Sequence, residues 1–222
     1  AVIVYYLVPA RWQWLVLLSF SYIYYIAGGI KYVGFLLFST LVTWMIALLI
    51  EKEETAGKHK RARKFVILGL ILNFGMLGLI KYTNFAVENL NALFHMNLRG
   101  MEILLPLGIS FYTFQSSGYI LDVYWKRCKA EHNPLKYALF VSFFPQLVAG
   151  PIERAGNLLG QLKEKHTMRG ENLLNGFWLM LRGFYKKVVV ADYLAVYVDK
   201  VYAAPQDAGG IGAVLGTGFF AV

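Results

Sequence analysis

The stretch Phe140–Arg154, FVSFFPQLVAGPIER, decides the fold of this chain, because it is apolar enough to enter a bilayer but too broken to cross one as a plain helix. A membrane-spanning helix needs about 20 predominantly apolar residues in a row. Pro145 removes a backbone donor in the middle of the run, and the pair Gly150-Pro151 breaks it a second time. We therefore predict a re-entrant segment, which dips into the membrane and returns to the same side.

Basic residues flank this segment on both sides. They are Lys126, Arg127, Lys129 and Lys136 before it, and Arg154, Lys163, Lys165 and Arg169 after it. Because positively charged loops tend to stay in the cytoplasm, both ends of the segment are expected there. Irregular backbone at membrane depth is tolerated only inside protein or along a water-filled cavity. The segment is therefore expected to line such a cavity.

The composition favours an all-α polytopic membrane protein. Of the 222 residues, 58% are hydrophobic and only 16% are charged, whereas a soluble domain has about 25% charged residues. The net charge of +9 lies in short connectors beside apolar blocks, where membrane topology and anionic lipid headgroups explain it better than a nucleic-acid partner does. Cys128 is the only cysteine, which excludes an intrachain disulfide and a cysteine-based metal site. We expect one integral-membrane domain over residues 1–222.

Apolar blocks before the broken segment predict several transmembrane helices. These blocks are Ala1–Val8, taken as the end of a first span, then Trp12–Ala27, Ile30–Ile50, Phe65–Ile80 and Ile103–Trp125. The stretch Glu51–Lys64 has six basic residues and is predicted to be a cytoplasmic loop, which fixes the orientation of the spans. Tyr82–Gly100 mixes apolar and polar residues and predicts an amphipathic helix on the outer surface.

The chain after the broken segment is more highly charged. Ala155–Glu171 is predicted to be a polar linker. Asn172–Tyr185 and Val188–Ala204 are apolar segments that Lys186-Lys187 is expected to separate, and both are too charged for simple lipid-facing helices. Both ends of the chain are apolar and uncapped, and we expect them to be cut from a longer protein.

The predicted helix Ile109–Tyr124 carries the first two candidate substrate-binding residues, Tyr112 and Gln115. Tyr112, Gln115 and Tyr119 are spaced three and four apart and share one helical face. Polar groups at membrane depth usually face a bundle interior or water. Two interpretations stay open, a tunnel wall that contacts substrate and hydrogen bonds to neighbouring helices. Asp122 is expected to pair with Lys126 or Arg127.

Four further residues complete the candidate substrate-binding set. Gln146 could satisfy backbone groups freed by Pro145, and Arg154 could pair with Glu153 or bind the phosphates of a donor. Arg182 and Lys186 share a helical face, where snorkelling to the membrane interface is the ordinary interpretation and donor binding the alternative.

The histidines lie where a buried general base is not expected. His59, His132 and His166 fall in polar connectors, and His95 falls in the amphipathic stretch. The sequence also lacks a glycine-rich phosphate loop, a nucleophile elbow and metal-binding spacing, so no metal is expected. These residues alone indicate a membrane protein with an internal polar cavity and name no reaction.

Two long strings carry a family resemblance. LLPLGISFYTFQSSGYILDVY (Leu104–Tyr124) and FFPQLVAGPIER (Phe143–Arg154) resemble the membrane-bound O-acyltransferase family, and most closely its bacterial branch that acetylates alginate and related exopolysaccharides. Lys81–Phe85 and Gly183–Asp192 are similar to the same branch.

The resemblance implies helices around a deep channel in the bacterial plasma membrane, crossed several times by the chain. An acyl thioester, acetyl-CoA or another, would be the donor substrate on the cytoplasmic side, with no bound cofactor. A polysaccharide outside would be the acceptor, reached through an extracytoplasmic partner acetyltransferase. The family's catalytic histidine lies in a tryptophan-histidine motif that does not occur before Val222. We therefore assign no catalytic residue and expect the first half of a longer enzyme.

Three alternatives to acetyl transfer stay open. The branch that transfers D-alanine to teichoic acid shares the fold and would need a carrier-protein donor. A transporter or channel without chemistry also uses broken helices at mid-membrane, although no second broken segment in a matching half is visible here. A scaffold that only organises a biosynthetic complex is the third.

Overall fold

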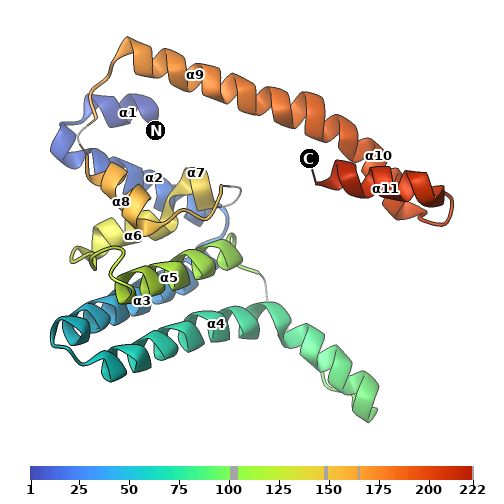
Figure 1. Ribbon diagram of the computed structural model, residues 1–222, viewed down its shortest axis with the longest axis horizontal. Coiled ribbons are helices and arrows are strands. Elements are labelled where there is room, and N and C mark those ends of the chain that lie inside the picture. Colours follow the sequence, from blue (N-terminus) through green and yellow to red (C-terminus); the bar gives the residue numbers. More distant parts are fainter. Residues whose placement is uncertain (101–104, 148–149, 165, 222) are drawn as a thin grey trace. The chain divides into compact units, whose positions relative to one another are not determined.

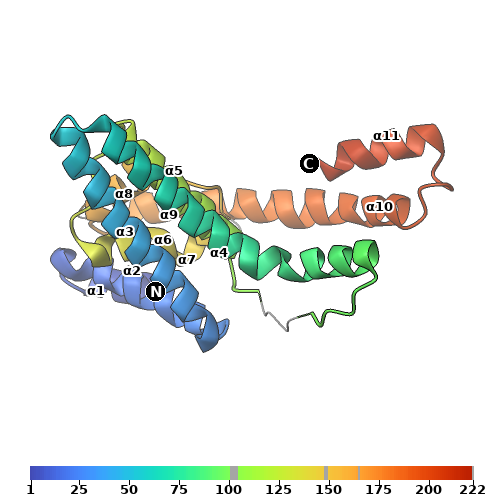
Figure 2. The same cartoon turned by 90° about the horizontal axis from the view of Figure 1, so that it is seen from below.

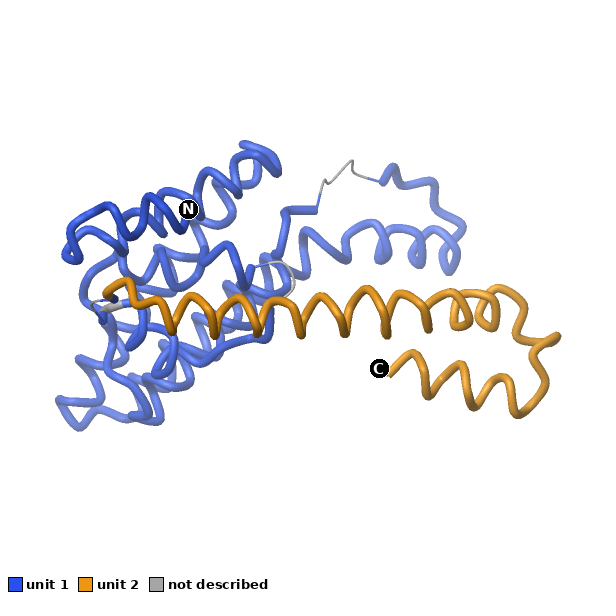
Figure 3. The backbone as a smooth tube through the Cα atoms, turned by 90° about the horizontal axis from the view of Figure 1, so that it is seen from above, with its two compact units in different colours: residues 1–166 blue, residues 167–222 orange. Residues whose placement is uncertain are grey.

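The computed structural model describes residues 1–100, 105–147, 150–164 and 166–221. All regular elements in these ranges are helical, which confirms the all-α prediction (Figure 1). The chain forms two compact units, Ala1–His166 and Thr167–Val222 (Figure 3), and each is described by itself. The expectation of one membrane domain over residues 1–222 stays a prediction.

The first unit begins with α1 (Val2–Leu7), a 3-10 turn at Ala10–Trp12, and α2 (Gln13–Ala27). The turn after α2 is possible because Gly29 has a φ of +139°, which residues with side chains rarely adopt. A second 3-10 turn at Ile30–Tyr32 leads directly into α3 (Val33–Thr55).

Three helices form the centre of this unit. The long helices α3 and α4 (His59–Phe94) form a hairpin, and α5 (Ile109–Tyr124) lies against both of them (Figures 1 and 2). Gly69 of α4 permits this close packing. A Cβ atom there would lie 2.6 Å from Ile120 of α5 and 3.1 Å from Ile46 of α3, so a larger residue would force the helices apart.

Within the described ranges, two helices are long and apolar enough to cross a membrane. They are Ile30–Thr55, which includes α3, and α4 with its 36 residues. Only 39% and 22% of their most apolar windows are buried, whereas the core helix of a soluble protein would be mostly buried. These helices agree with the spans predicted at Ile30–Ile50 and Phe65–Ile80 and fit a membrane protein.

The other predicted spans are shorter in the structure. α2 has 15 residues and α5 has 16, fewer than the about 20 that a perpendicular span needs. The predicted start of the second of these spans, Ile103, lies outside the described residues.

The prediction that Glu51–Lys64 forms a loop is wrong. Helix α3 continues to Thr55 and α4 begins at His59, so only Ala56–Lys58 connects them. Glutamate, lysine, arginine and alanine are good helix formers, and they extend both helices beyond the apolar blocks.

The predicted separate surface helix Tyr82–Gly100 is also wrong in its boundaries. α4 runs without interruption through Ile80 and Lys81 to Phe94, and His95 ends it in the left-handed conformation with a φ of 49°. Figure 1 shows that this last part bends away from α3 and α5.

The broken segment consists of short pieces. α6 (Pro134–Ser142) and α7 (Phe144–Leu147) are followed, beyond residues 148–149, by non-helical residues up to Arg154. α6 is about 14 Å long at 1.5 Å per residue, too short for a hydrocarbon core of about 30 Å. A first break falls at Phe143, between α6 and α7, and the second lies between α7 and α8. Pro145 lies in the first turn of α7, where its missing N–H has no helical partner to lose.

The predicted linker Ala155–Glu171 is wrong over its first half. Residues Ala155–Lys163 form α8, which buries Ala155 and Leu159. α8 closes the first unit against α5 and α6.

The second unit is a long helical rod followed by a return helix. α9 (Gly170–Phe184) continues through a π-helical segment, Tyr185–Ala191, into α10 (Asp192–Ala203), and α11 (Gly209–Phe220) packs on α10. The expected interruption at Lys186-Lys187 is therefore wrong. The Lys187 ammonium contacts the Asp192 carboxylate five residues on, a spacing that the wider π turn brings onto one face.

Candidate functional site

The predicted binding face of α5 is buried inside the first unit. Tyr112 is 0% exposed in the core, together with Tyr25 of α2. Gln115 donates from Nε2 to the Phe140 carbonyl of α6 at 3.0 Å. The Tyr119 hydroxyl accepts from the backbone N–H of Glu131 at 2.8 Å. Of the two interpretations, a tunnel wall or hydrogen bonds to neighbouring segments, the contacts of Gln115 and Tyr119 therefore support the second.

Gln115 also borders a cavity of about 220 Å³, here called the α5–α8 cavity. Its wall on the α5 side includes Gly118 and Asp122, and its opposite wall is the segment Ile152–Ala155. Gly118 contributes to the space, because a Cβ there would have no neighbour within 4 Å. The cavity brings together two of the six candidate substrate-binding residues, Gln115 and Arg154.

The charges around the α5–α8 cavity are partly paired. Asp122 lies 3.6 Å from Arg127, which confirms the expected ion pair. Arg127 also lies over the Trp125 ring at 4.7 Å. Glu153 accepts a hydrogen bond from Asn157 at 3.1 Å.

Arg154 is an exposed cation at the cavity wall, as Arg127 is. It precedes α8 in an extended conformation, and among the described residues it has no ion-pair partner. The expected pair between Glu153 and Arg154 is not formed within this described part of the chain. A guanidinium without a carboxylate partner can bind a phosphate or carboxylate through two parallel hydrogen bonds.

Gln146 braces the break, although not through the group that was expected. Its Nε2 donates to the Pro151 carbonyl at 2.6 Å, and its own carbonyl accepts from the Gly150 N–H at 2.9 Å. A Cβ at Gly150 would lie 2.7 Å from the Gln146 Cα. Gln146 thus joins the end of α7 to the residues Gly150 and Pro151 that follow it. It is not among the residues that border the α5–α8 cavity.

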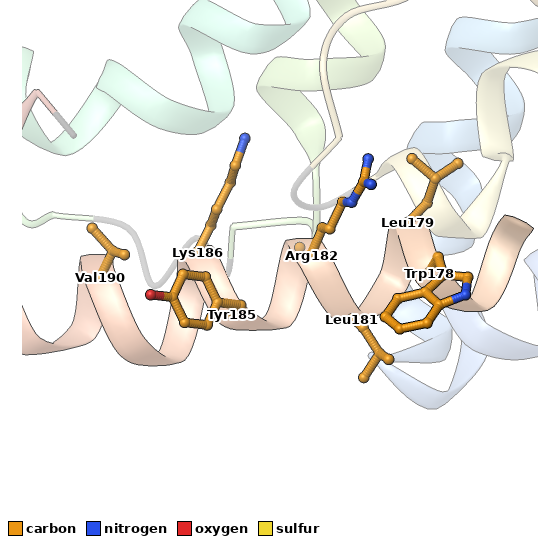
Figure 4. A pocket seen from close by; sticks show the side chains of 8 residues that line it. Trp178, Leu179, Leu181, Arg182, Tyr185, Lys186 and Val190 are labelled. Atoms are coloured by element: carbon orange, nitrogen blue, oxygen red, sulfur yellow. The ribbon is translucent and has the colours of Figure 1, made fainter.

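Arg182 and Lys186 belong to the second unit. Their exposed side chains point the same way from one continuous helix, as Figure 4 shows. The described residues that line the surrounding hollow of about 1120 Å³ all belong to this helix, among them Trp178 and Tyr185. A single helix encloses nothing, so this is an open surface of the second unit, which is described by itself.

Two glutamates near the end of α3 make a second polar cluster, which sequence reasoning missed. Glu54 contacts His59 at 2.8 Å and Lys126 at 3.3 Å. Glu51 contacts His132 at 3.1 Å and accepts from the Ala130 N–H at 2.9 Å. This glutamate pair, three residues apart, ties the connector between α5 and α6 to the α3–α4 turn.

The four histidines agree with the expectation that none is a buried base. His59, His95, His132 and His166 are all exposed. No group of three or more potential metal-ligating side chains occurs in the described ranges.

The structure adds Asp122, Trp125 and Arg127 to the candidate site. A signal for Asp122 was present in the sequence, because Gln115, Tyr119 and Asp122 follow the i, i+4, i+7 spacing of one helical face. The approach of the Ile152–Ala155 segment had no such signal, since it depends on the tertiary fold.

Known proteins align with most of this chain. It is 38% identical over 207 residues to a "Probable alginate O-acetylase" of Azotobacter vinelandii, covering 90% of this chain and 40% of that protein. A protein of the same name from Pseudomonas aeruginosa is 38% identical, with 90% of this chain and 38% of the relative covered. A "Peptidoglycan O-acetyltransferase" of Helicobacter pylori is 34% identical, with 84% and 39% covered.

These matches confirm the resemblance drawn from the two long strings. The chain spans about 40% of the length of these curated relatives. No protein-family profile and no solved structure matches it.

Proposed function

We propose that this chain, a member of the alginate O-acetylase branch of the membrane-bound O-acyltransferase family, is part of a membrane enzyme that acetylates an extracytoplasmic polysaccharide. The observation that carries the proposal is the alignment of 90% of the chain with proteins named alginate O-acetylase. These names favour acetyl transfer over D-alanyl transfer and over transport without chemistry.

The α5–α8 cavity is the proposed cytoplasmic entrance for the donor. Lys126 at the end of α5 contacts Glu54 at the end of α3, so the cavity beside Trp125 and Arg127 lies near the α3–α4 turn. Basic residues concentrate at this turn, which favours the cytoplasmic side. An acyl thioester such as acetyl-CoA carries phosphates, and Arg154 is the cation free to bind them.

The re-entrant course of Phe140–Arg154 is part of this proposal. Before the segment, Lys136 lies over the Trp14 ring at 5.7 Å. After it, the His166 carbonyl accepts from Gln13 Nε2 at 3.0 Å. The residues before and after the segment thus both contact the first turn of α2, at the adjacent residues Gln13 and Trp14. This supports a course in which Phe140–Arg154 enters the membrane and returns to the same face.

The acceptor, the partner and the location follow from the same proposal. An alginate-like exopolysaccharide is the first candidate acceptor, and an extracytoplasmic acetyltransferase completes the transfer to it. The similarity to the Helicobacter pylori protein makes peptidoglycan the second candidate acceptor. A multi-pass position in a bacterial plasma membrane places the donor and the polymer on opposite sides.

The test compares Arg154→Ala with Arg169→Ala in the full-length protein. Both arginines are exposed and directly precede a helix, but only Arg154 borders the cavity. A hydrogen bond to a charged group contributes about 1.5–3 kcal/mol. Arg154→Ala should therefore lower the rate of acetyl transfer to the polymer roughly ten- to hundredfold, with partial recovery in Arg154→Lys.

Ester-linked acetate on isolated alginate and on peptidoglycan is the readout, measured in cells that lack the native enzyme. Acetate on neither polymer with the unmodified protein would refute the function. Equal activity of the two alanine variants would refute the α5–α8 cavity as the donor entrance but would leave the acetyl-transfer function standing.

A further inference from the structure

A groove between α3 and α4 shares no lining residue with the α5–α8 cavity. It has a volume of about 750 Å³ and is almost entirely apolar, with side chains such as Phe38 and Leu79 along its walls. Of the residues that the structure describes, Lys31 is the one charged residue that borders it.

Glycines keep this groove open. A Cβ at Gly34 of α3 or at Gly75 of α4 would meet nothing within 4 Å. Nearer the α3–α4 turn, a Cβ at Gly69 would lie 3.1 Å from Ile46, so the two helices are in close contact there. The groove therefore ends part of the way along the hairpin.

The length of the groove matches one leaflet of a bilayer. On α4 it extends from Ile71 to Ile80, which is about 14 Å at 1.5 Å per residue. That is about half of a hydrocarbon core of 30 Å. The groove itself therefore has the length of one acyl chain, because exposed apolar residues nearer the turn, such as Met45 and Ile67, do not border it.

The charge lies at the end where a lipid headgroup would be. Lys31 precedes α3, at the opposite end of the helix from the basic α3–α4 turn. If that turn is cytoplasmic, the groove opens in the outer leaflet, with the ammonium at the phosphate level.

We propose that this groove binds one phospholipid of the outer leaflet, with an acyl chain between Gly34 and Gly75 and the phosphate at Lys31. The lipid seals a gap that two packed helices leave open. The proposal does not depend on the acetyl-transfer function, because it rests on the groove between α3 and α4, on Lys31 and on the membrane side of the basic α3–α4 turn.

Native mass spectrometry of the full-length protein tests the proposal, after extraction from nanodiscs of phosphatidylethanolamine and phosphatidylglycerol. We expect one retained phospholipid in the unmodified protein and none in Gly75→Leu, whose side chain fills the groove. Gly78→Leu is the matched control, since Gly78 is also on α4 with nothing within 4 Å of its Cβ but does not border the groove. Equal retention in the two leucine variants would overturn the proposal.

A second pair of variants tests the contact between Lys31 and the lipid phosphate. Lys31→Gln should weaken retention of phosphatidylglycerol about fivefold, the effect of one basic residue near an anionic surface. Lys81→Gln, which changes a lysine that does not border the groove, should leave retention unchanged. The same loss in both variants would refute Lys31 as the phosphate contact.

A photoreactive benzoylphenylalanine in place of Phe38 identifies the occupant without altering the glycines. Irradiation in the same nanodiscs should give a phospholipid adduct. A crosslink to another segment of the protein, or to a second copy, would overturn the proposal.

Discussion

At the scale of single residues, Lys126 carries backbone strain at the end of α5. Its φ is 59°, the left-handed region that glycine usually occupies after a helix. The Arg127 N–H bonds the Asp122 carbonyl at 2.8 Å and the Lys126 N–H bonds the Val123 carbonyl at 3.0 Å. This pair of bonds is the Schellman motif, with a lysine where a glycine is expected.

The motif predicts that Lys126→Gly is more stable than Lys126→Ala. Both variants lose the ion pair to Glu54, so that contribution cancels, and only alanine keeps the left-handed strain. The difference should be about 1 kcal/mol in favour of glycine. Chemical or thermal unfolding of both variants in the same detergent measures it, and equal stability would contradict the strained-cap interpretation.

Cys128 gives a prediction of pH dependence. Burial raises the pKa of its thiol to about 11, and the carboxylates of Asp122 and Glu51 add to the effect. The thiolate is the reactive form. Alkylation by iodoacetamide should therefore rise about tenfold per pH unit from pH 7 to pH 10 without levelling, in contrast to an ordinary thiol of pKa about 8.5.

Glutathione in the same buffers is the control for the reagent. A plateau for Cys128 near pH 9 would mean that the thiol is solvated and that the connector is open. In denaturant the profile should shift to that of glutathione, because burial is the main cause of the raised pKa.

At the scale of elements, the break between α7 and α8 depends on a close backbone approach. Gly150→Leu should abolish polymer acetylation, because its Cβ would lie 2.7 Å from the Gln146 Cα. Membrane insertion should persist, since α3 and α4 are unchanged. Gly156→Leu in α8 is the control, because a Cβ at Gly156 meets nothing within 4 Å.

A milder variant separates loss of the break from loss of the whole fold. Gln146→Ala removes only the hydrogen bond to the Pro151 carbonyl, worth about 1 kcal/mol, and should lower acetylation while the protein remains folded. Ester-linked acetate and detergent extraction are measured together. Normal acetylation by Gly150→Leu would contradict a functional role for the break.

Sequence patterns predicted these elements unevenly, for physical reasons. The apolar blocks identified α3 and α4, because burial in lipid demands uninterrupted apolar residues. The patterns failed at Glu51–Lys64 and at Lys186-Lys187, where charged residues leave the membrane or face outward without breaking a helix. Charge marks the polarity of the surroundings, whereas the backbone conformation depends on helix propensity and capping.

The candidate site was predicted only where its contacts are local. Asp122 and Arg127 are five residues apart, on the two sides of the C-terminal end of α5, and their ion pair was expected because they are so close in sequence. Glu51 and Ala130 are 79 residues apart, and no periodicity within either segment indicates that contact. The α5–α8 cavity could not be predicted either, because its two walls come from separate segments that meet only after the chain has folded.

At the scale of the whole first unit, a chain of contacts places several connectors at one end. Glu54 pairs with Lys126, while Glu51 contacts His132 and accepts a hydrogen bond from the Ala130 N–H. These contacts join the α3–α4 turn to the connector between α5 and α6. The start of α6 then reaches α2, where Lys136 lies over Trp14.

This arrangement predicts the membrane sidedness of the broken segment. Single cysteines replacing Lys58, Lys136 and Lys163, each in a Cys128→Ala background, should react with a membrane-impermeant maleimide only after the cell is opened. A cysteine replacing Lys31 should react in intact cells, because Lys31 lies at the opposite end of α3 from Lys58. Lys136 precedes the broken segment and Lys163 follows it, so their equal sidedness is the decisive result. Reaction of one in intact cells and of the other only in opened cells would mean that Phe140–Arg154 crosses the bilayer, and the re-entrant cavity wall would have to be abandoned.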